Sequence, residues 1–578
     1  MSSGTFRTVS TKRLVTRLAR IKLDFGADFE LLKDSLLGEL GTRVDYTGTE
    51  LLKLHEILCF MEAHPDSRRC LDRVTHLLTA FESLLKMSMN LDGAQRTLLA
   101  DTGVAGSYIE YPFSYHTAIW LNRRYGKDIE IDWDGFDNYD VLSGFLHLLA
   151  SGLEVPTIDD PSVEIDRWIK WRSSREGLTD FQWLMNRLLN SGVSEVGLEG
   201  IYEVLDLTLI WELRSGGASR TRSSLGYGAS FFQEVALSKG TGNIRDRISS
   251  PLPKVSSLGV SGGREVIDLA YAALSVRGRE IYPLFYANPK DVHLVQMHRG
   301  VVFALVGMKE RKRFGLDTDY FFLGLKNDVP ICYGSGVICL NEVEVAINIF
   351  STFRRGESAW LYVELMRLFR QVFGVDSFLI DKFQIGAEDN DDAIKSGAFW
   401  FYHKLGFKPV QAKARAFLKL ELGKKKSEGR TYRTKKSVLR QFATSDLRFH
   451  LEAGKKGGGS VDLASIGFAL EPHLNGEGLL NTHEGALLRL GVSKNPDWTP
   501  NQKHWIKVFS PLVVSIPDME KWSRKEKRLF MDLILAKADG SEFEYLKLLN
   551  SHSRLKESLQ ELSRVGGRIK RRLSNNHN

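Results

Sequence analysis

Three consecutive segments set the architecture of this chain: EVEVAINIF (342–350), STFRRGESAWLYVELMRLFRQVF (351–373) and VDSFLID (375–381). The first alternates polar and apolar residues, as a half-buried strand does. The second has apolar residues at three- and four-residue spacing, which predicts an amphipathic helix over 357–373. The third is short, apolar and partly β-branched, which indicates another strand.

Apolar segments on both sides extend this pattern. GREVIDLAYAALSVRGRE (263–280) predicts a helix, and the runs 300–308, 319–326 and 329–340 predict strands divided by turns. A helix is expected over 389–404, and ARAFLKLEL (414–422) is expected to be a last strand. We therefore predict an α+β domain with a mixed sheet and packed helices over 264–423.

The rest of the chain falls into four regions. Apolar residues at helical spacing predict a mainly helical N-terminal region over 1–213 and a mainly helical C-terminal region over 461–578. Residues 214–263 are rich in Gly and Ser and predict an irregular connection. Residues 424–460 carry a run of Lys and Arg and then GKKGGGS (454–460), which predicts a basic, flexible linker.

Composition excludes several classes of protein. The chain has 578 residues and a net charge of +8, which is modest for a general nucleic-acid binder. Its four cysteines lack the C-x-x-C spacing of a zinc or redox site, so reduced thiols in a cytoplasmic protein are expected, with no metal. No apolar run reaches the roughly 18 residues that a membrane span needs.

The turn before the helix has the residues of an anion site. It places Arg354, Arg355 and Gly356 directly before Ser358 and Ala359. Backbone N–H groups at a helix start bind phosphate, glycine allows close approach, and arginine adds charge-assisted contacts. The alternative is an ordinary strand-to-helix turn with exposed arginines, and the acidic Glu357 in the same turn supports that alternative.

A second motif follows in NDDAIKSGAFWFYHKLGF (390–407). Together with the turn, it resembles the GNAT (Gcn5-related N-acetyltransferase) superfamily, whose members use acetyl-CoA as acyl donor. The resemblance implies that the turn residues Arg354 to Ala359 hold the pyrophosphate and that Asn390 hydrogen-bonds the pantetheine arm. It also implies that Ile347 and Ile349 lie along that arm, and that Tyr402 protonates the departing thiolate. The alternative is that Tyr402, one of four consecutive aromatic residues, packs in a core.

Acyl transfer to an amine also needs a base, because an ammonium group cannot attack. In the strand 342–350, Glu342 and Glu344 share one face. Glu344 is the first candidate and Glu342 the second, and the alternative is a solvated strand face. The backbone N–H groups of residues 345–350 are expected to face the thioester carbonyl.

These observations predict an acyl-CoA-dependent N-acyltransferase, with acetyl-CoA as donor and a small-molecule or protein amine as acceptor. The competing prediction is a non-catalytic GNAT-like sensor or scaffold with helical interaction regions. Residues 424–440, with Tyr432 among Lys and Arg, provide a possible contact for an acidic partner. The third prediction, which is favoured less than the other two, is that this segment and the basic tail bind nucleic acid.

Overall fold

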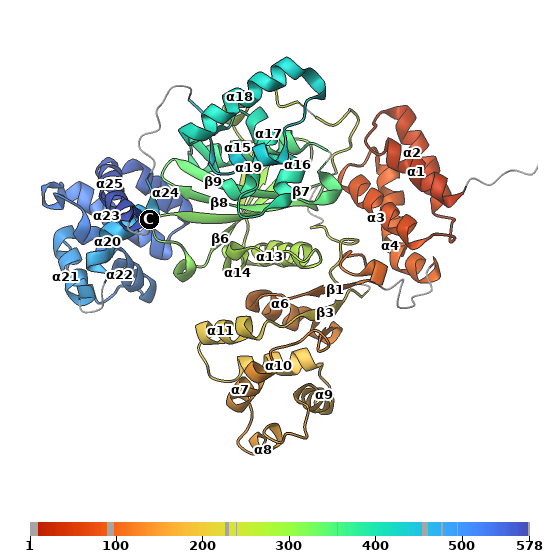
Figure 1. The fold of residues 1–578 in the computed structure, drawn as a ribbon, viewed down its shortest axis with the longest axis horizontal. Coiled ribbons are helices and arrows are strands. Elements are labelled where there is room, and N and C mark those ends of the chain that lie inside the picture. Colours follow the sequence, from red (N-terminus) through yellow and green to blue (C-terminus); the bar gives the residue numbers. More distant parts are fainter. Residues whose placement is uncertain are drawn as a thin grey trace, which may run out of the picture.

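A nine-stranded mixed sheet lies at the centre of the molecule, with helices on both faces and helical regions at both ends (Figure 1). This computed structural model describes residues 10–88, 97–214, 216–225, 230–238, 240–354, 356–452, 461–474, 478–493 and 495–575. The predicted α+β class with a mixed sheet is confirmed.

The sheet has the strand order β11-β12-β10-β9-β8-β7-β6-β5-β4. Strands β4 to β9 form an antiparallel meander, β9 and β10 are parallel, and β12 is antiparallel to both β10 and β11. The bounds are β4 Lys254–Ser257, β5 Ala287–Gln296, β6 Val301–Met308, β7 Thr318–Lys326, β8 Val329–Cys339, β9 Glu342–Ile349, β10 Ser377–Ile380, β11 Lys408–Pro409 and β12 Leu447–His450. The predicted strands between 300 and 381 are thus confirmed.

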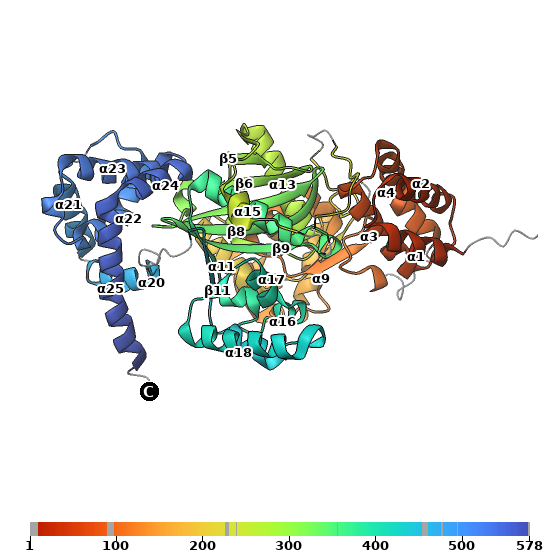
Figure 2. The same cartoon turned by 90° about the horizontal axis from the view of Figure 1, so that it is seen from above.

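Helix α15 (Ser358–Phe373) crosses from β9 to β10 over one face of the sheet. Contact is close at Gly336 in β8, where an added Cβ would lie 2.2 Å from the ring of Phe369. That face also carries the buried Val343 and Val345 of β9. Helices α13 (Val260–Ser275) and α14 (Tyr282–Phe285) lie on the opposite side of the sheet (Figures 1 and 2).

The segment after β10 differs from the prediction in two ways. The predicted helix 389–404 is divided into α16 (Asp391–Ser396) and α17 (Ala398–Lys404) by Gly397, whose φ of +71° ends the first helix. The predicted strand 414–422 is wrong, because it lies within helix α18 (Ala412–Glu428). The alternation of residues 414–422 suggested a strand. The residues that α18 buries, however, are Ala414, Leu418 and Glu421, which are at helical spacing.

The region predicted as a basic linker also contains regular structure. After α18 come η5 (Gly429–Thr431), α19 (Lys436–Phe442) and β12, and β12 lies between β10 and β11 in the sheet. The expected linker was therefore wrong for residues 424–450, which complete the central domain. The Gly-rich part 454–460 lies outside the described residues.

The N-terminal 213 residues form two separate units. Helices α1 (Thr11–Ile21), α2 (Ala27–Leu40), α3 (Gly48–Ala63) and α4 (Arg68–Ser88) share one hydrophobic core with the sheet domain. Residues 108–213 have a core of their own around a small sheet of order β1-β3-β2. Their elements are β1 Tyr108–Tyr111, α6 Tyr115–Tyr125, η1 Gly126–Asp128, β2 Ile129–Ile131, α7 Tyr139–Leu149, α8 Val155–Ile158, α9 Ile165–Arg175, α10 Asp180–Leu189, α11 Glu195–Leu205 and β3 Leu209–Glu212.

The Gly/Ser-rich connection 214–263 ties these parts together. It holds α12 (Ile244–Ser249), β4 and the start of α13. The backbone N–H of Gln233 donates to Pro65 at 2.7 Å, and Asn327 after β7 donates to Ala63 at 2.9 Å. The connection is therefore packed along the junction between the N-terminal helices and the sheet.

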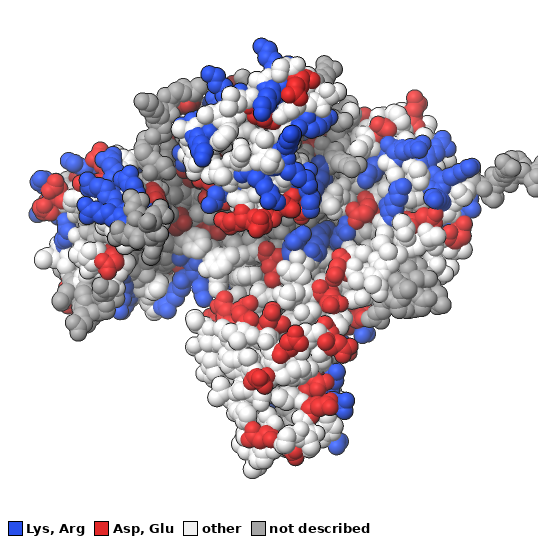
Figure 3. Space-filling model, viewed as in Figure 1, with Lys and Arg blue, Asp and Glu red and all other residues white. Residues whose placement is uncertain are grey.

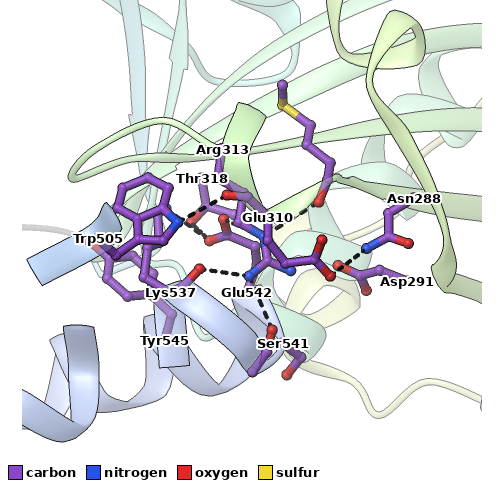
Figure 4. A network of polar contacts seen from close by, with 12 residues as sticks. Asn288, Asp291, Glu310, Arg313, Thr318, Trp505, Lys537, Ser541, Glu542 and Tyr545 are labelled. Atoms are coloured by element: carbon purple, nitrogen blue, oxygen red, sulfur yellow. Dashed lines mark hydrogen bonds and ion pairs between the residues drawn. The ribbon is translucent and has the colours of Figure 1, made fainter. Parts of the chain in front are cut away.

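The C-terminal helices are joined to the sheet by a buried polar network (Figure 4). Glu542 is 2% exposed and lies 3.0 Å from Lys537 Nζ, and it accepts a 2.5 Å hydrogen bond from Thr318 of β7. Arg313 donates to the carbonyl of Lys537 at 2.8 Å. The helices are α20 Leu463–Leu470, α21 Gly478–Leu490, α22 Pro500–Ser515, α23 Arg524–Asp539, α24 Glu542–Ser551 and α25 Ser553–Asn575.

Two predictions from composition can be compared with the structure. All four cysteines are free thiols, as expected. No helix in the described part of the chain is long and apolar enough to cross a membrane.

Candidate functional site

The strands β9 and β10 pair only at their beginnings. Three pairs join them, Glu342 with Ser377, Val343 with Phe378 and Leu379 with Glu344. β9 continues to Ile349 and stays paired with β8 throughout, while β10 ends at Ile380. The edge of β9 from residue 345 to 349 therefore has no strand beside it within the described chain, and the two strands open toward the start of α15.

The turn before α15 uses its polar groups internally. Arg354 donates from Nε to the carbonyl of Ile349 at 2.9 Å, and the Ser358 hydroxyl donates to the Arg354 carbonyl at 2.8 Å. Gly356 donates its backbone N–H to Phe353 at 3.1 Å. Arg355, also predicted to bind phosphate, lies outside the described residues. The arginine that can be placed thus folds back toward β9.

The Glu357 carboxylate, directly before α15, forms ion pairs with two cations. The residue is 7% exposed, and its carboxylate lies 3.0 Å from Lys326 Nζ and 2.9 Å from Arg299 Nη1. The backbone N–H of Ser238 also donates to it at 3.0 Å. Sequence reasoning placed Glu357 in the turn but had no signal for these partners, because they come from the end of β7, from the turn between β5 and β6, and from the connection.

Little space remains directly against this turn. Ile349, Ser358 and Glu357 line a cavity of about 20 Å³, which holds about one water molecule. The N-terminal helices close it, since His64 lines the same cavity and Glu56 of α3 contacts Thr352 at 2.5 Å. In the described residues the backbone N–H groups of Ser358 and Ala359 have no acceptor, as expected for the first turn of a helix.

Tyr402 of α17 lies in an aromatic cluster on the α15 face of the sheet. It is 5% exposed, and its ring centroid is 5.4 Å from that of Tyr362 in α15 and 5.9 Å from that of Phe407. Burial raises the pKa of the Tyr402 phenol, so the hydroxyl stays protonated at neutral pH. The Tyr362 hydroxyl in the same cluster is buried and has no hydrogen-bond partner among the described residues. An unpaired buried hydroxyl is unusual in a folded protein.

Asn390 acts as a cap in this structure. Its side chain accepts from Ala393 N at 3.2 Å, which caps α16, and donates to the Phe383 carbonyl at 2.9 Å. The oxygen and the nitrogen of its side-chain amide therefore both form hydrogen bonds within the segment from the end of β10 to α16.

The two candidate bases lie on the face opposite to α15 and have different surroundings. Glu342 forms an ion pair with Arg448 of β12 at 2.8 Å and accepts from the Ser377 hydroxyl at 2.6 Å. Glu344 is exposed and makes no hydrogen bond or ion pair with the described residues. Partial enclosure, followed by repulsion from Asp381, Asp446 and Glu342, raises its pKa to about 7. A carboxylate with that pKa suits proton transfer near neutral pH, which favours Glu344 over Glu342.

A large groove begins at these carboxylates. It has a volume of about 1220 Å³ and extends from the exposed ends of β9, β10 and β12 to helices α20, α24 and α25. Sequence reasoning did not find it, because part of its far wall is formed by helices α24 and α25, which begin more than 90 positions after β12. In Figure 3, a band of acidic side chains runs beside a hollow in the surface, below the more basic region around α18.

The basic segment 424–440 lies on this outer region. Lys425 stacks over the ring of Trp400 at 3.8 Å, Tyr432 donates to Glu421 at 2.7 Å, and Arg440 pairs with Asp391. Part of its charge is therefore used within the domain, and the acidic partner stays a prediction.

No group of three or more metal-ligating side chains occurs in the described part of the chain. No family model, curated protein or solved structure matches this chain.

Proposed function

We propose that this chain is an acyl-CoA-dependent N-acyltransferase of the GNAT type, with its CoA site between β9 and β10. The opening of these two parallel strands beyond Glu344 carries the proposal, because a thioester arm lying there would take the place of the missing strand. The strand order β9-β10-β12-β11, with α15 connecting β9 to β10, supports it.

The proposed reaction is a direct transfer. Glu344 removes a proton from the acceptor ammonium, and the free amine attacks the thioester carbonyl. A C–N bond forms and the C–S bond breaks, while N–H groups at the free edge of β9 stabilise the oxyanion. The CoA thiolate takes a proton from Tyr402, and the second proton that the acylated nitrogen loses goes to solvent, from which the Tyr402 phenol is restored. Glu344 and Tyr402 lie on opposite faces of the sheet, so donor and acceptor would meet through the opening.

The experiment is a calorimetric and thermal-shift titration of the full chain with acetyl-CoA, with adenosine 3′,5′-bisphosphate and free CoA as controls. At about 100 times its dissociation constant a ligand adds roughly 2.7 kcal/mol to the folded state. A saturable shift with acetyl-CoA supports the site. Absence of both heat and shift would refute it.

A second function is favoured by one observation. Glu357 and its cations fill the start of α15, where the pyrophosphate is expected, and leave a cavity of only about 20 Å³. This supports a GNAT-like core that serves as a scaffold without catalysis. The two functions differ in the titration above, since a scaffold with a filled phosphate site binds no acetyl-CoA.

A further inference from the structure

Two surfaces of opposite charge lie at opposite ends of the molecule. In Figure 1 the unit of residues 108–213 lies below the sheet, and helix α18 lies above it. Basic side chains gather around α18 in Figure 3, whereas the lower unit shows acidic and uncharged side chains with a few basic ones at its edge. The two surfaces therefore do not contact each other within one chain.

The lower surface, here called the acidic tip, spans residues 130–171. Its exposed acids that form no ion pair with a described residue are Glu130, Asp134, Asp137 and Asp140. Burial, then repulsion from carboxylates that include Asp134 and Asp137, raises the pKa of Tyr139. These two acids therefore lie near one tyrosine. Like charges that are held together without a counter-charge attract a cationic surface.

A groove adjoins these acids. It has a volume of about 390 Å³, and Glu164, Arg167, Trp168 and Trp171 are among the residues that line it. Glu164 is another of the carboxylates that act on Tyr139, which places the groove next to the acids. Arg167 is paired with Glu164 at 2.6 Å, so its charge is used within the groove. Trp171 is 53% exposed, and tryptophan is enriched in contact surfaces between proteins.

The upper surface, here called the basic face, is one exposed side of α18. Lys413, Leu420 and Lys424 follow one another at spacings of seven and four residues, so they share this side of the helix. Leu420 is 66% exposed, and both lysines are exposed without an ion pair to any described residue. The basic face therefore presents an apolar side chain with a cation on each side of it.

The charge and the apolar groups of the two surfaces are complementary. A helix that lays one side into a groove, with contacts at i, i+4 and i+7, is a recurring mode of protein recognition. Nucleic acid would use the lysines and leave Leu420 exposed. An anionic membrane would use both kinds of side chain but leave the acidic tip without a partner. A second copy of the chain satisfies both surfaces, so charge complementarity favours it.

We propose that copies of this chain associate head to tail, with α18 of one copy in the groove of the acidic tip of the next. Leu420 enters the groove, and Lys413 and Lys424 face the carboxylates around Tyr139. The two surfaces differ and lie at opposite ends, so each contact leaves one surface of each kind free. Association therefore continues into chains longer than a dimer. The inference is independent of the proposed acyltransferase function.

The test is sedimentation velocity of the full chain over a range of protein concentrations. At about 0.1 M salt, where exposed charges act over about 10 Å, we expect the average mass to rise with concentration beyond that of two chains. At about 1 M salt this range falls to about 3 Å, and we expect single chains.

Two double variants locate the contact. Lys413→Glu/Lys424→Glu reverses the charge of the basic face, and Asp134→Lys/Asp137→Lys reverses that of the acidic tip. Each should weaken self-association at least tenfold. All four side chains are exposed, so both variants are expected to fold. An equimolar mixture of the two variants should form a dimer of one copy of each and nothing larger, because only one intact surface of each kind remains.

A control and a third variant separate this contact from general charge effects. Arg524→Glu/Lys525→Glu changes the net charge as much as the basic-face variant does, in exposed residues at the start of α23, and should associate like the unaltered chain. Leu420→Ser keeps every charge and should still weaken the association, because the groove loses its apolar contact.

Other outcomes overturn the inference. Single chains at every concentration at about 0.1 M salt would do so, as would oligomers that the α23 control weakens as much as the other variants do. A dimer that never grows would show a two-fold contact instead, and a mixture of the two double variants that stays unassociated would exclude the pairing of these surfaces. A single chain that binds an RNA duplex or phosphatidylserine vesicles, and loses this binding in Lys413→Glu/Lys424→Glu, would assign the basic face to that partner.

Discussion

Glu357→Gln removes the charge that holds the start of α15 in place. The unaltered carboxylate has cations at 2.9 and 3.0 Å, and one of them, Lys326, has a side chain that is 1% exposed. The variant would leave this ammonium group buried without a counter-charge. Breaking a buried ion pair in this way costs about 3–5 kcal/mol. At about 2–4 °C per kcal/mol, the melting temperature of the sheet domain should fall by roughly 6–20 °C.

The loss should depend on pH. Burial lowers the pKa of Lys326 below its ordinary value, and Glu357 opposes this effect. Without Glu357 the folded-state pKa falls further, so the unfolded chain binds more protons than the folded chain. Stability of the variant should therefore rise with pH, and its deficit should be smaller at pH 9 than at pH 7.

A double variant and a surface control complete the experiment. Adding Lys326→Met to Glu357→Gln removes the stranded charge and should restore most of the lost stability. The control Asp392→Asn breaks an exposed pair, 3.9 Å from Lys395, and should change stability by less than about 0.5 kcal/mol. Urea unfolding followed by tryptophan fluorescence measures all three variants. A loss below about 1 kcal/mol for Glu357→Gln that does not vary with pH would refute the reasoning.

Four further predictions follow from the site and the network. Tyr402→Phe should lower kcat by about 100-fold or more with little change in CoA affinity, and an unchanged rate would exclude it as the acid. Gly356→Glu should abolish acetyl-CoA binding while Gly356→Ala, whose Cβ meets nothing nearer than 3.4 Å, retains it; equal binding would show the phosphate turn to be misassigned. Lys537→Met should cost about 3–5 kcal/mol and increase hydrogen exchange in α23 and α24, and unchanged exchange would contradict the role of the network. Activity should rise from pH 6 to 8 as Glu344 loses its proton, and a profile that Glu344→Gln leaves intact would exclude it as the base.

Strong local patterns in the sequence were sufficient to predict the strands at the centre of the sheet. The strands from 301 to 349 and helix α15 could be predicted because each is either a continuous apolar run bounded by turns or a segment with one clear periodicity, over eight or more residues. The prediction of a strand at 414–422 was wrong because its short alternation also fits a helix. Packing of the segment decided between strand and helix. β12 was missed because it has four residues directly after a basic helical segment, and its pairing with β10 and β11 defines it as a strand.

For the candidate site, the sequence by itself determined the kinds of groups that are present: a glycine-containing turn before a helix, two acids on one strand face, and a tyrosine in an aromatic run. Tertiary structure decided their surroundings. It paired Glu357 with Lys326 and Arg299, paired Glu342 with Arg448, and placed no cation of the described residues in an ion pair with Glu344. The physical reason is that charge pairing and desolvation depend on distances between residues far apart in the chain, which no local pattern records.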